Sequence, residues 1–527
     1  MEYFVFRNTT VEPLFVDFNA EFSGYEDISN VPENAGCYIW FYLADIKFDN
    51  GFLISKIEDY YNKVELALSK IPKNAPFLII TLEKLHINKW IESDFRIEEC
   101  IFNFNKKVVE LSKKNSNIKI INFSEFLTNY SNKELIDWKF YYLSGVLLNP
   151  KLKNDFSNWL KAKLNAINYK RKKCIILDLD NTLWGGILGE AGTEGIELGN
   201  AYPGKAYSDV QEMLLQFKKH GVILAICSKN NETDVLEAWE KNPFIILKKD
   251  DFATYRINWN NKVTNILDIV NELNIGLDSV VFIDDNPSER ELVANSLPEI
   301  TVPELPKQPY SFIDFYTKIY RQYFQVYGLT EEDKNKTEQY RKRAEELKEQ
   351  KAFSSFEDYL LNLGLVLTIK PADKFNIPRI AQMTQKTNQF NLTTRRYTEK
   401  DIYDFLSKNY KIFSLSVKDK FGDYGITGVS IIEIKDKQAY VDTLLLSCRI
   451  LGKAIEKAFM SFLLNELFAG GIKTIAGEYM PTAKNMQTEN FFEGLGFSLE
   501  SSSNGRKSYI LEIKEKFPIQ SCYKMET

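Results

Sequence analysis

Short apolar runs alternate with longer amphipathic segments through the first third of the chain. The runs GCYIWFYL, APFLIITL and NIKIINF have the length and composition of buried strands, and KIEDYYNKVELALSKI, between the first two, spaces its apolar residues like a helix. Strands that alternate with helices predict a parallel sheet built from βαβ units. We therefore expect an α/β domain over residues 1–170, closed by a helix over 154–170.

The alternation begins again after the basic step RKK. Three apolar runs, CIILDLD, VILAICS and VVFIDD, each end in polar residues, and amphipathic segments separate them. This pattern predicts a second α/β domain over residues 171–309.

A helical linker is expected over residues 310–362. Its first half is rich in aromatic residues and its second half is strongly charged, with Tyr340, Ala344 and Leu347 as one apolar stripe.

The remaining residues, 363–527, predict an α+β domain. Three successive apolar strands form a meander, and KTIAGEYM adds a later strand. The expected elements after the meander are a helix over 451–468, a strand over 473–480 and a helix near 484–494.

Composition and charge then exclude several classes of protein. Of the 527 residues, 44% are hydrophobic and 26% charged, which is ordinary for globular domains. Lys and Arg number 67 against 72 Asp and Glu, whereas a nucleic-acid binder usually carries a basic excess. No apolar run has the length of a membrane span, and no secretory leader begins the sequence. We expect neither nucleic acid nor membrane as a partner.

Cysteine and histidine usage narrows the chemistry further. The six cysteines form no CxxC pair, which predicts reduced thiols and a cytoplasmic protein. The two histidines, His86 and His220, are too few for any mechanism that needs three or more.

Polar side chains follow the strands of the middle block in a fixed order. They are Asp178, Asp180 and Thr182 after the first strand, Ser228 at the end of the second, Lys262 in the following loop, and Asp284 and Asp285 after the last. The carboxyl ends of parallel strands meet at one edge of a sheet, where ligands bind. Clustered carboxylates repel one another unless a cation neutralises them, and oxygen ligands suit Mg²⁺. The metal ligands that we expect are Asp178, Asp180, Asp284 and Asp285.

This constellation predicts phosphoryl chemistry. A carboxylate beside a metal-bound phosphoryl group can attack phosphorus or orient it, and Asp178 has that place. Asp180 lies on the same strand face and can carry a proton for the leaving oxygen. Ser228 and Lys262 would stabilise the transferring phosphoryl oxygens. Individually, such aspartates are common as turn formers and helix caps.

The ordered set resembles the haloacid dehalogenase (HAD) superfamily of phosphatases and phosphotransferases, and this resemblance implies a Rossmann-like architecture for the domain over residues 171–309. More specifically, DLDNTLWGGILGE, AICSKN, NWNNK and LNIGLDSVVFIDDNPSERE resemble the FkbH-like family, HAD subfamily IIIC, and the similarity continues in NQFNLTTRRYTEKDI, LLLSCRILGKAIE and EYMPTAKN. The resemblance implies an enzyme that takes 1,3-bisphosphoglycerate, removes phosphate, holds the glyceryl unit as a Cys thioester and passes it to an acyl carrier protein.

The spacing of the motifs leaves no room for a large cap domain, so the HAD-like site is expected to be open. Five polar or aromatic residues near it are candidate substrate contacts, with packing or surface charge as the alternative: Thr182, Trp184, Lys229, Asn230 and Arg256.

The loop SCRILGKAIE contains an R-x-x-G-x-A pattern at Arg449, Gly452 and Ala454, between a strand and a helix. With the meander before it, this region resembles GNAT acyltransferases, which implies an acyl-pantetheine site at the loop; a glycine kept for packing is the alternative. No histidine serves as a base there. The possible substitutes are Asp423, Asp442, Glu478 and Tyr479, and the sequence does not rank them.

Two cysteines lie next to these motifs. Cys227 precedes Ser228, and Cys448 precedes Arg449. Either could hold the acyl group, although cysteines on apolar strands usually pack, and strand alternation turns Cys227 away from the side to which Ser228 points. Arg395 and Arg396 could meet an acidic carrier protein or be solvated.

The family's first domain is similar to SGNH hydrolases. This chain has no G-D-S near its start and no D-x-x-H near 135–165, and His86 is too early to serve. We expect a degenerate scaffold there. Two alternatives to the acyl-transfer function remain open: a simple phosphatase for a small phosphomonoester, and a non-catalytic protein that docks a carrier. The sequence is silent on oligomeric state.

Overall fold

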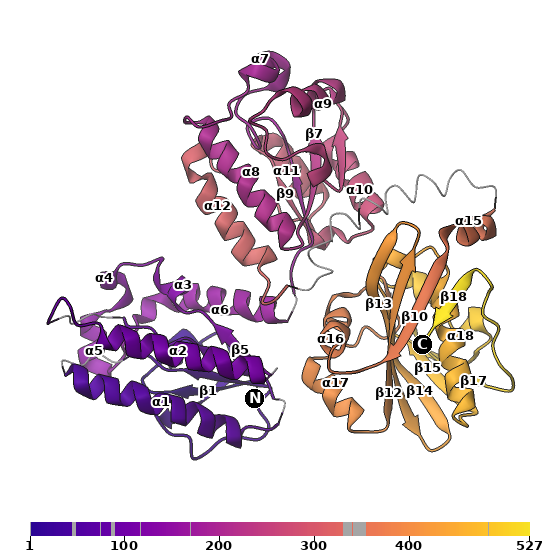
Figure 1. Ribbon diagram of the computed structural model, residues 1–527, viewed down its shortest axis with the longest axis horizontal. Coiled ribbons are helices and arrows are strands. Elements are labelled where there is room, and N and C mark those ends of the chain that lie inside the picture. The colour runs from indigo at the N-terminus through magenta and orange to yellow at the C-terminus, as the bar shows by residue number, and fades with distance from the viewer. Residues whose placement is uncertain are drawn as a thin grey trace. The chain divides into compact units, whose positions relative to one another are not determined.

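The computed structural model describes residues 2–44, 49–73, 75–85, 90–115, 117–168, 170–329, 340, 355–482 and 484–527, with all their side chains except those of Asn50 and Cys448. His86, Ala344 and Leu347, singled out from the sequence, lie outside these residues. The chain divides into two compact units, Met1–Ile167 with Glu399–Tyr403, and Asn168–Thr398 with Asp404–Thr527. The second unit contains two separate sheets (Figure 1).

The N-terminal domain is built on a parallel sheet in the strand order β2-β1-β3-β4-β5. Its strands are β1 (Tyr3–Arg7), β2 (Ala20–Tyr25), β3 (Cys37–Phe41), β4 (Phe77–Ile80) and β5 (Ile118–Ile121). Its helices are α1 (Asn50–Lys70), α2 (Arg96–Lys114), α3 (Ser124–Leu127), α4 (Asn132–Leu135), α5 (Trp138–Ser144) and α6 (Lys153–Ile167).

Both faces of this sheet are covered. Along β3, Trp40 packs with residues of α1 and α2, whereas Phe41 packs on the opposite face with Phe156 of α6. The inner strands β3 and β4 are therefore apolar throughout, as parallel strands between two helical layers are. The predicted parallel α/β architecture is confirmed, and the three expected strands correspond to β3, β4 and β5.

The middle domain has a parallel sheet in the order β8-β7-β6-β9. Its strands are β6 (Cys174–Leu177), β7 (Ile223–Ser228), β8 (Thr254–Ile257) and β9 (Val280–Ile283). Its helices are α7 (Leu188–Gly195), α8 (Gly204–Lys219), α9 (Glu232–Lys241), α10 (Lys262–Leu273), α11 (Pro287–Ser296) and α12 (Phe312–Ile319).

Helix α12 belongs to the core of this domain, although its sequence falls in the expected linker. Phe312, Tyr316 and Ile319 are buried with α8 residues, and the ring of Phe312 meets that of Tyr207 edge-on. The aromatic spacing that gives α12 one apolar face is the reason.

The C-terminal domain has a mixed sheet in the order β16-β17-β15-β14-β13-β12-β10-β18, and β11 pairs with β14. Its strands are β10 (Leu365–Pro371), β11 (Phe390–Asn391), β12 (Tyr410–Asp419), β13 (Gly422–Lys435), β14 (Gln438–Leu446), β15 (Thr474–Tyr479), β16 (Ser498–Ser503), β17 (Arg506–Glu512) and β18 (Tyr523–Glu526). Its helices are α15 (Phe356–Leu363), α16 (Ile377–Lys386), α17 (Glu399–Leu406) and α18 (Ile455–Ala469).

The meander β12-β13-β14 and the strand β15 match the expected ones, but the helix expected near 484–494 is wrong. Short 3-10 turns at Met486–Thr488 and Glu493–Leu495 stand there instead. The Asn485 side chain donates to the carbonyls of Asn391 and Met480 and holds the chain away from a continuous helix.

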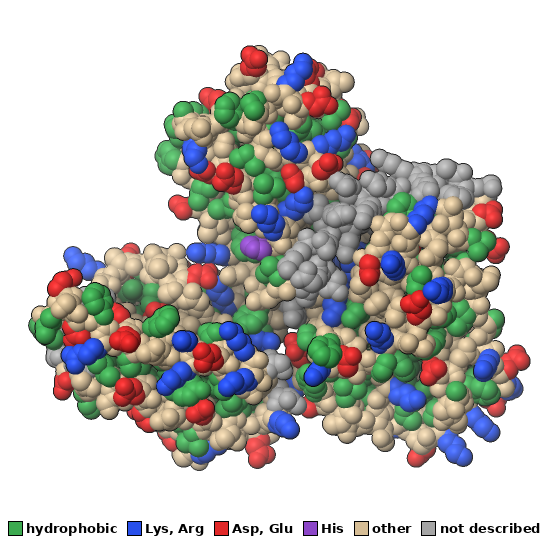
Figure 2. Space-filling model, in the orientation of Figure 1, with side chains coloured by type: hydrophobic (Ala, Val, Ile, Leu, Met, Phe, Trp, Pro, Cys, Tyr) green, Lys and Arg blue, Asp and Glu red, His purple; other side chains and the backbone are tan. Residues whose placement is uncertain are grey.

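Charged side chains of both signs are interspersed over the face in Figure 2, which agrees with the near balance of charge in the sequence. Among the helices that the structure describes, none has the length and apolar character needed to cross a membrane.

Candidate active site

A tight turn after β6 places the first two aspartates. The amides of Thr182 and Leu183 both donate to the carbonyl of Leu179. Asn181, within this turn, has a left-handed φ of 51°. Gly185 follows at a close approach, because a Cβ there would lie 2.2 Å from the Glu197 carboxylate. The W-G-G sequence therefore lets the chain fold back beside the strand end.

Three carboxylates come together at the carboxyl edge of the sheet. Oxygens of Asp178, Asp284 and Asp285 lie within 4.8 Å of one another. The ammonium of Lys262 is 3.1 Å from Asp178 Oδ1 and contacts Asp284. Lys262 is buried at the first turn of α10, which brings it to this edge from the loop after β8.

The electrostatics of this cluster call for positive charge. Burial raises the pKa of Asp178, against the opposing effects of Lys262 and the Ser228 hydroxyl. Burial, followed by the charge of Asp178, raises the pKa of Asp284, and burial with Asp284 raises that of Asp285. Burial opposes the charge on Lys262, but the two carboxylates beside it raise its pKa overall.

These residues fit Mg²⁺. Asp178 Oδ1 is buried and has no hydrogen-bond partner among the described residues, only the ammonium contact, so it keeps room for a cation. A set of three carboxylates is the oxygen donor type that Mg²⁺ prefers. Asp178, Asp284 and Asp285 would hold the ion.

Asp180 lies outside this cluster because other groups hold its carboxylate. Oδ1 accepts hydrogen bonds from Trp184 Nε1 at 2.9 Å and from the Leu188 amide at 3.1 Å. Oδ2 accepts one from Asn230 Nδ2 at 2.9 Å. Trp184 and Asn230, expected as substrate contacts, therefore orient Asp180.

The remaining predicted substrate contacts differ in their placement. Lys229 pairs with Glu289 at 2.6 Å, close to the cluster, whereas Arg256 pairs with Glu272 of α10. The Thr182 hydroxyl is buried and has no hydrogen-bond partner among the described residues.

Cys227 is buried on the face of the sheet that α10 covers, and its sulfur lies 3.9 Å from the Lys262 carbonyl oxygen. Burial raises its thiol pKa to about 12, and the charges of Asp178 and Asp284 act in the same direction. A thiol in that setting is largely protonated at neutral pH and is a poor nucleophile. Cys448 has a described backbone only.

One positioning residue was not foreseen from the sequence. Arg290 on α11 donates to the carbonyls of Asp284 at 2.9 Å and Asp285 at 2.6 Å, and so fixes the loop that carries both carboxylates. Its spacing after Asp-Asp-Asn-Pro, which starts the helix, is the signal that could have found it.

In the C-terminal domain, the R-x-x-G-x-A loop forms a sharp turn before α18. Gly452 has a φ of 87° and Ala454 a φ of 52°, and Arg449 is buried. Lys453, between them, points inward: its ammonium lies 2.7 Å from Asp419 and 3.3 Å from the Tyr424 hydroxyl. That buried ion pair anchors the loop.

We expect Gly452→Ala to destabilise the C-terminal domain by about 1 kcal/mol, because an L-residue is strained at this positive φ. A Cβ at this position meets nothing within 4 Å, so backbone strain alone causes the loss. Scanning calorimetry of the full chain measures it. Gly494→Ala is the matched control, since its surroundings are equally open and its φ is not positive; equal transition temperatures for the two variants would contradict the prediction.

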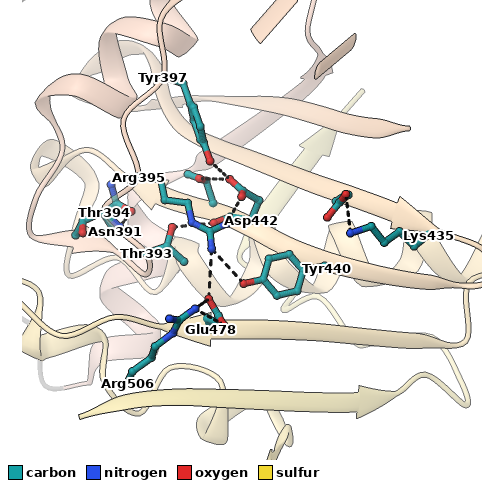
Figure 3. A network of polar contacts seen from close by, with 12 residues as sticks. Asn391, Thr393, Thr394, Arg395, Tyr397, Lys435, Tyr440, Asp442, Glu478 and Arg506 are labelled. Atoms are coloured by element: carbon teal, nitrogen blue, oxygen red, sulfur yellow. Dashed lines mark hydrogen bonds and ion pairs between the residues drawn. The ribbon is translucent and has the colours of Figure 1, made fainter. Parts of the chain in front are cut away.

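A polar network lies where β14 and β15 begin to separate (Figure 3). Asp442, the extra residue of a bulge in β14, accepts hydrogen bonds from Tyr397 at 2.7 Å and Thr443 at 2.9 Å, and is paired with Arg395. Arg395 also lies 3.4 Å from Glu478 on β15. Arg395 is thus engaged within the domain.

The other residues that the sequence offered as a base lie elsewhere. Tyr479 is buried in the hydrophobic core, and Asp423 closes a turn by accepting from the Gly425 amide. Arg396 donates to main-chain carbonyls, including that of Thr387 at 3.0 Å.

The gap between β14 and β15 is filled by the chain itself. The two strands pair from Gln438 with Thr474 as far as Val441 with Gly477, and no further. Beyond that point an inserted segment, Phe390–Thr393, pairs with β14, and its Leu392 accepts from the Met480 amide at 2.8 Å. All four residues of the inserted segment are buried.

The middle domain thus has the class of site that phosphatases with a metal-binding carboxylate cluster use. Among solved structures, the chain is similar to the N-terminal part of a Bacteroides fragilis protein containing a phosphatase domain complexed with Mg: 28% identity, 62% of this chain, 95% of that chain and a TM-score of 0.54. No protein-family model and no curated protein sequence matches the chain.

Acetyltransferases match over a smaller share. The ribosomal-protein-S18-alanine N-acetyltransferase of Escherichia coli matches 28% of this chain and 95% of its own, with 18% identity and a TM-score of 0.23. A GNAT-family acetyltransferase of Staphylococcus aureus matches 28% of this chain and 99% of its own, with 11% identity and a TM-score of 0.23.

We expect the wild-type chain to bind Mg²⁺ at the carboxylate cluster, and Asp284→Asn to weaken that binding at least tenfold because one anionic ligand is lost. Isothermal titration calorimetry measures both. Asp180→Asn is the control, since the carboxylate of Asp180 lies outside the cluster; equal losses in the two variants would show that the ligand set is different.

Proposed function

We propose that this chain is a Mg²⁺-dependent enzyme of the HAD type that releases phosphate from an acyl phosphate such as 1,3-bisphosphoglycerate and passes the glyceryl unit to a thiol, ultimately that of an acyl carrier protein. The observation that carries the reaction class is the cluster of Asp178, Asp284 and Asp285 with Lys262. The likeness to a phosphatase domain complexed with Mg supports it.

In this proposal the described residues divide the work. Asp178 contacts the phosphoryl group, and Lys262 and Ser228 stabilise its oxygens. Bound Mg²⁺ would supply charge neutralisation at the carboxylates. Arg290 keeps the loop of Asp284 and Asp285 in place.

The engagement of Asp180 favours an acyl phosphate over a phosphomonoester. Three donors within the domain already occupy its two oxygens. A phosphomonoester releases an alkoxide, which needs a proton from an acid at the site, whereas an acyl phosphate releases a group that is stable without one. This geometry suits a substrate with a good leaving group.

The transfer step is an acyl substitution, in which a thiol displaces phosphate from the acyl carbon. The acceptor sulfur bonds to the acyl carbon, the bond from that carbon to the phosphate oxygen breaks, and the thiol proton leaves with the phosphate. With 1,3-bisphosphoglycerate, the thioester formed in this step keeps the second phosphate, at C3 of the glyceryl unit. The burial of Cys227 among apolar residues, which raises its thiol pKa, does not favour it as acceptor. Cys448 or the thiol of a carrier arm is the acceptor that we propose.

The position of Cys227 also favours a second candidate, a simple phosphatase acting on a small phosphate ester. In that reaction Asp178 attacks phosphorus, and water then releases phosphate from the aspartyl-phosphate. The two candidates break different bonds.

Incubation with 1,3-bisphosphoglycerate, Mg²⁺ and pantetheine in ¹⁸O-water separates them. Acyl transfer cleaves the carbon–oxygen bond, so the phosphate released from the acyl group carries no label and a phosphoglyceryl thioester forms. Labelled phosphate without thioester establishes the simple phosphatase. Phosphate release no faster than that of the Asp178→Asn variant would reject both.

A further inference from the structure

An exposed tryptophan follows a strand end at the same edge of the sheet as the carboxylate cluster and has no part in the chemistry described so far. Trp259 follows β8 at the edge of the sheet that carries Asp178, and its residue is 69% exposed. Trp184, in the same domain, is 1% exposed. A large aromatic surface left in water at such an edge is typical of a contact residue.

Hydrogen bonds fix this indole in place. Trp259 Nε1 donates to Asn231 Oδ1 at 2.9 Å, and Asn231 in turn donates to Asp234 at 3.1 Å. The loop beneath is also held: the Asn258 amide donates to the Ser228 carbonyl at 3.1 Å, and the Asn265 side chain donates to Asn258 Oδ1 at 2.9 Å. The ring is therefore presented on a rigid loop.

The same loop and its neighbour position the reacting groups. Lys262 lies three residues after Trp259, and its ammonium contacts Asp178. Asn230, which precedes the partner of the indole, holds Asp180. Trp259 is thus joined by one hydrogen bond to the residue that follows the partner of Asp180.

The surroundings of the ring suit an uncharged group. The loop residues beside it, Asn258, Asn260 and Asn261, are neutral amides, and the nearest charge in its hydrogen-bond chain is the carboxylate of Asp234. The indole and the amides beside it offer no positive charge of their own to an anionic acyl phosphate, whereas a neutral chain with amide and methyl groups could pack on the indole and bond to the asparagines.

We propose that Trp259 is the specificity residue for the acyl acceptor and contacts the uncharged pantetheine arm that carries the accepting thiol. This inference rests on the proposed acyl transfer. It assigns the charged phosphoryl group to the carboxylate and lysine cluster, and the neutral arm to the rim formed by Trp259 and Asn231.

Initial rates with 1,3-bisphosphoglycerate and pantetheine test this assignment. We expect Trp259→Ala to raise the KM for pantetheine about tenfold, equivalent to about 1.4 kcal/mol of binding, with the KM for the acyl phosphate unchanged. Trp259→Phe should keep most of the affinity, because it retains an aromatic face. Trp90→Ala, which removes a 68% exposed indole of the N-terminal domain, is the matched control.

Two results would overturn the assignment. A raised KM for the acyl phosphate would place Trp259 against the phosphorylated substrate, and an unchanged KM for pantetheine would remove it from the acceptor site. Failure of the proposed function itself looks different, since the wild-type chain would then release phosphate without forming any thioester, and the inference would fall with it.

Discussion

Asp178→Asn is expected to lower the rate of phosphate release by at least a thousandfold, equivalent to about 4 kcal/mol of transition-state stabilisation. The substitution keeps the shape of the side chain but removes the charge that, in the proposed reaction, faces both the phosphoryl group and the metal. The loss is expected whether Asp178 attacks phosphorus or orients the phosphate, since both need the anion.

Colorimetric detection of phosphate measures this effect, and a circular dichroism spectrum checks the fold. Asp268→Asn, on the exposed side of α10 in the same domain, removes an equal charge away from the cluster and should leave the rate unchanged. A variant at position 178 that kept more than a tenth of the wild-type rate would contradict the proposed role.

Lys453→Met is expected to destabilise the C-terminal domain by about 3–5 kcal/mol, because it leaves the Asp419 carboxylate buried without its cation. The side chains of Lys453 and Asp419 are 4% and 0% exposed. In calorimetry of the full chain, the transition of this domain should fall by about 10 °C.

A double variant tests whether the pair causes the loss. Lys453→Met combined with Asp419→Asn removes both charges, while the side-chain oxygen of the new amide can still accept from the Phe421 and Gly422 amides, as the carboxylate does. We expect the double variant to be more stable than Lys453→Met alone. Additive losses in the double variant would mean that the two side chains act independently.

The carboxylate cluster could be predicted because it depends on a simple rule. Asp178, Ser228 and Asp284 each end an apolar strand, and parallel strands bring such ends to one edge. The partners of Asp180 could not be predicted in this way. Trp184 reaches it through the turn geometry at Asn181, and Asn230 comes from the neighbouring strand.

In the fold, too, some elements could be predicted from the sequence and others could not. Central strands such as Cys37–Phe41 are apolar throughout, so their pattern is plain, whereas the strands that were missed, such as Ala20–Tyr25 and Thr254–Ile257, are half exposed and interrupted by polar residues. Helix α18 begins at Ile455, whereas the sequence pattern predicts a helix from residue 451. The turn before it could not be predicted, because the positive φ values of Gly452 and Ala454 belong to backbone geometry that composition does not reveal.

The inserted segment determines how fast a ligand could reach the edge of β14 in the C-terminal domain. Leu392 donates to the Leu444 carbonyl at 3.2 Å and accepts from Met480, so it joins the two halves of the sheet across their gap. While these hydrogen bonds hold, the inner edge of β14 has no backbone groups there that could bind a ligand. Its rate of entry would be limited by local unfolding of Phe390–Thr393 and not by diffusion to the surface.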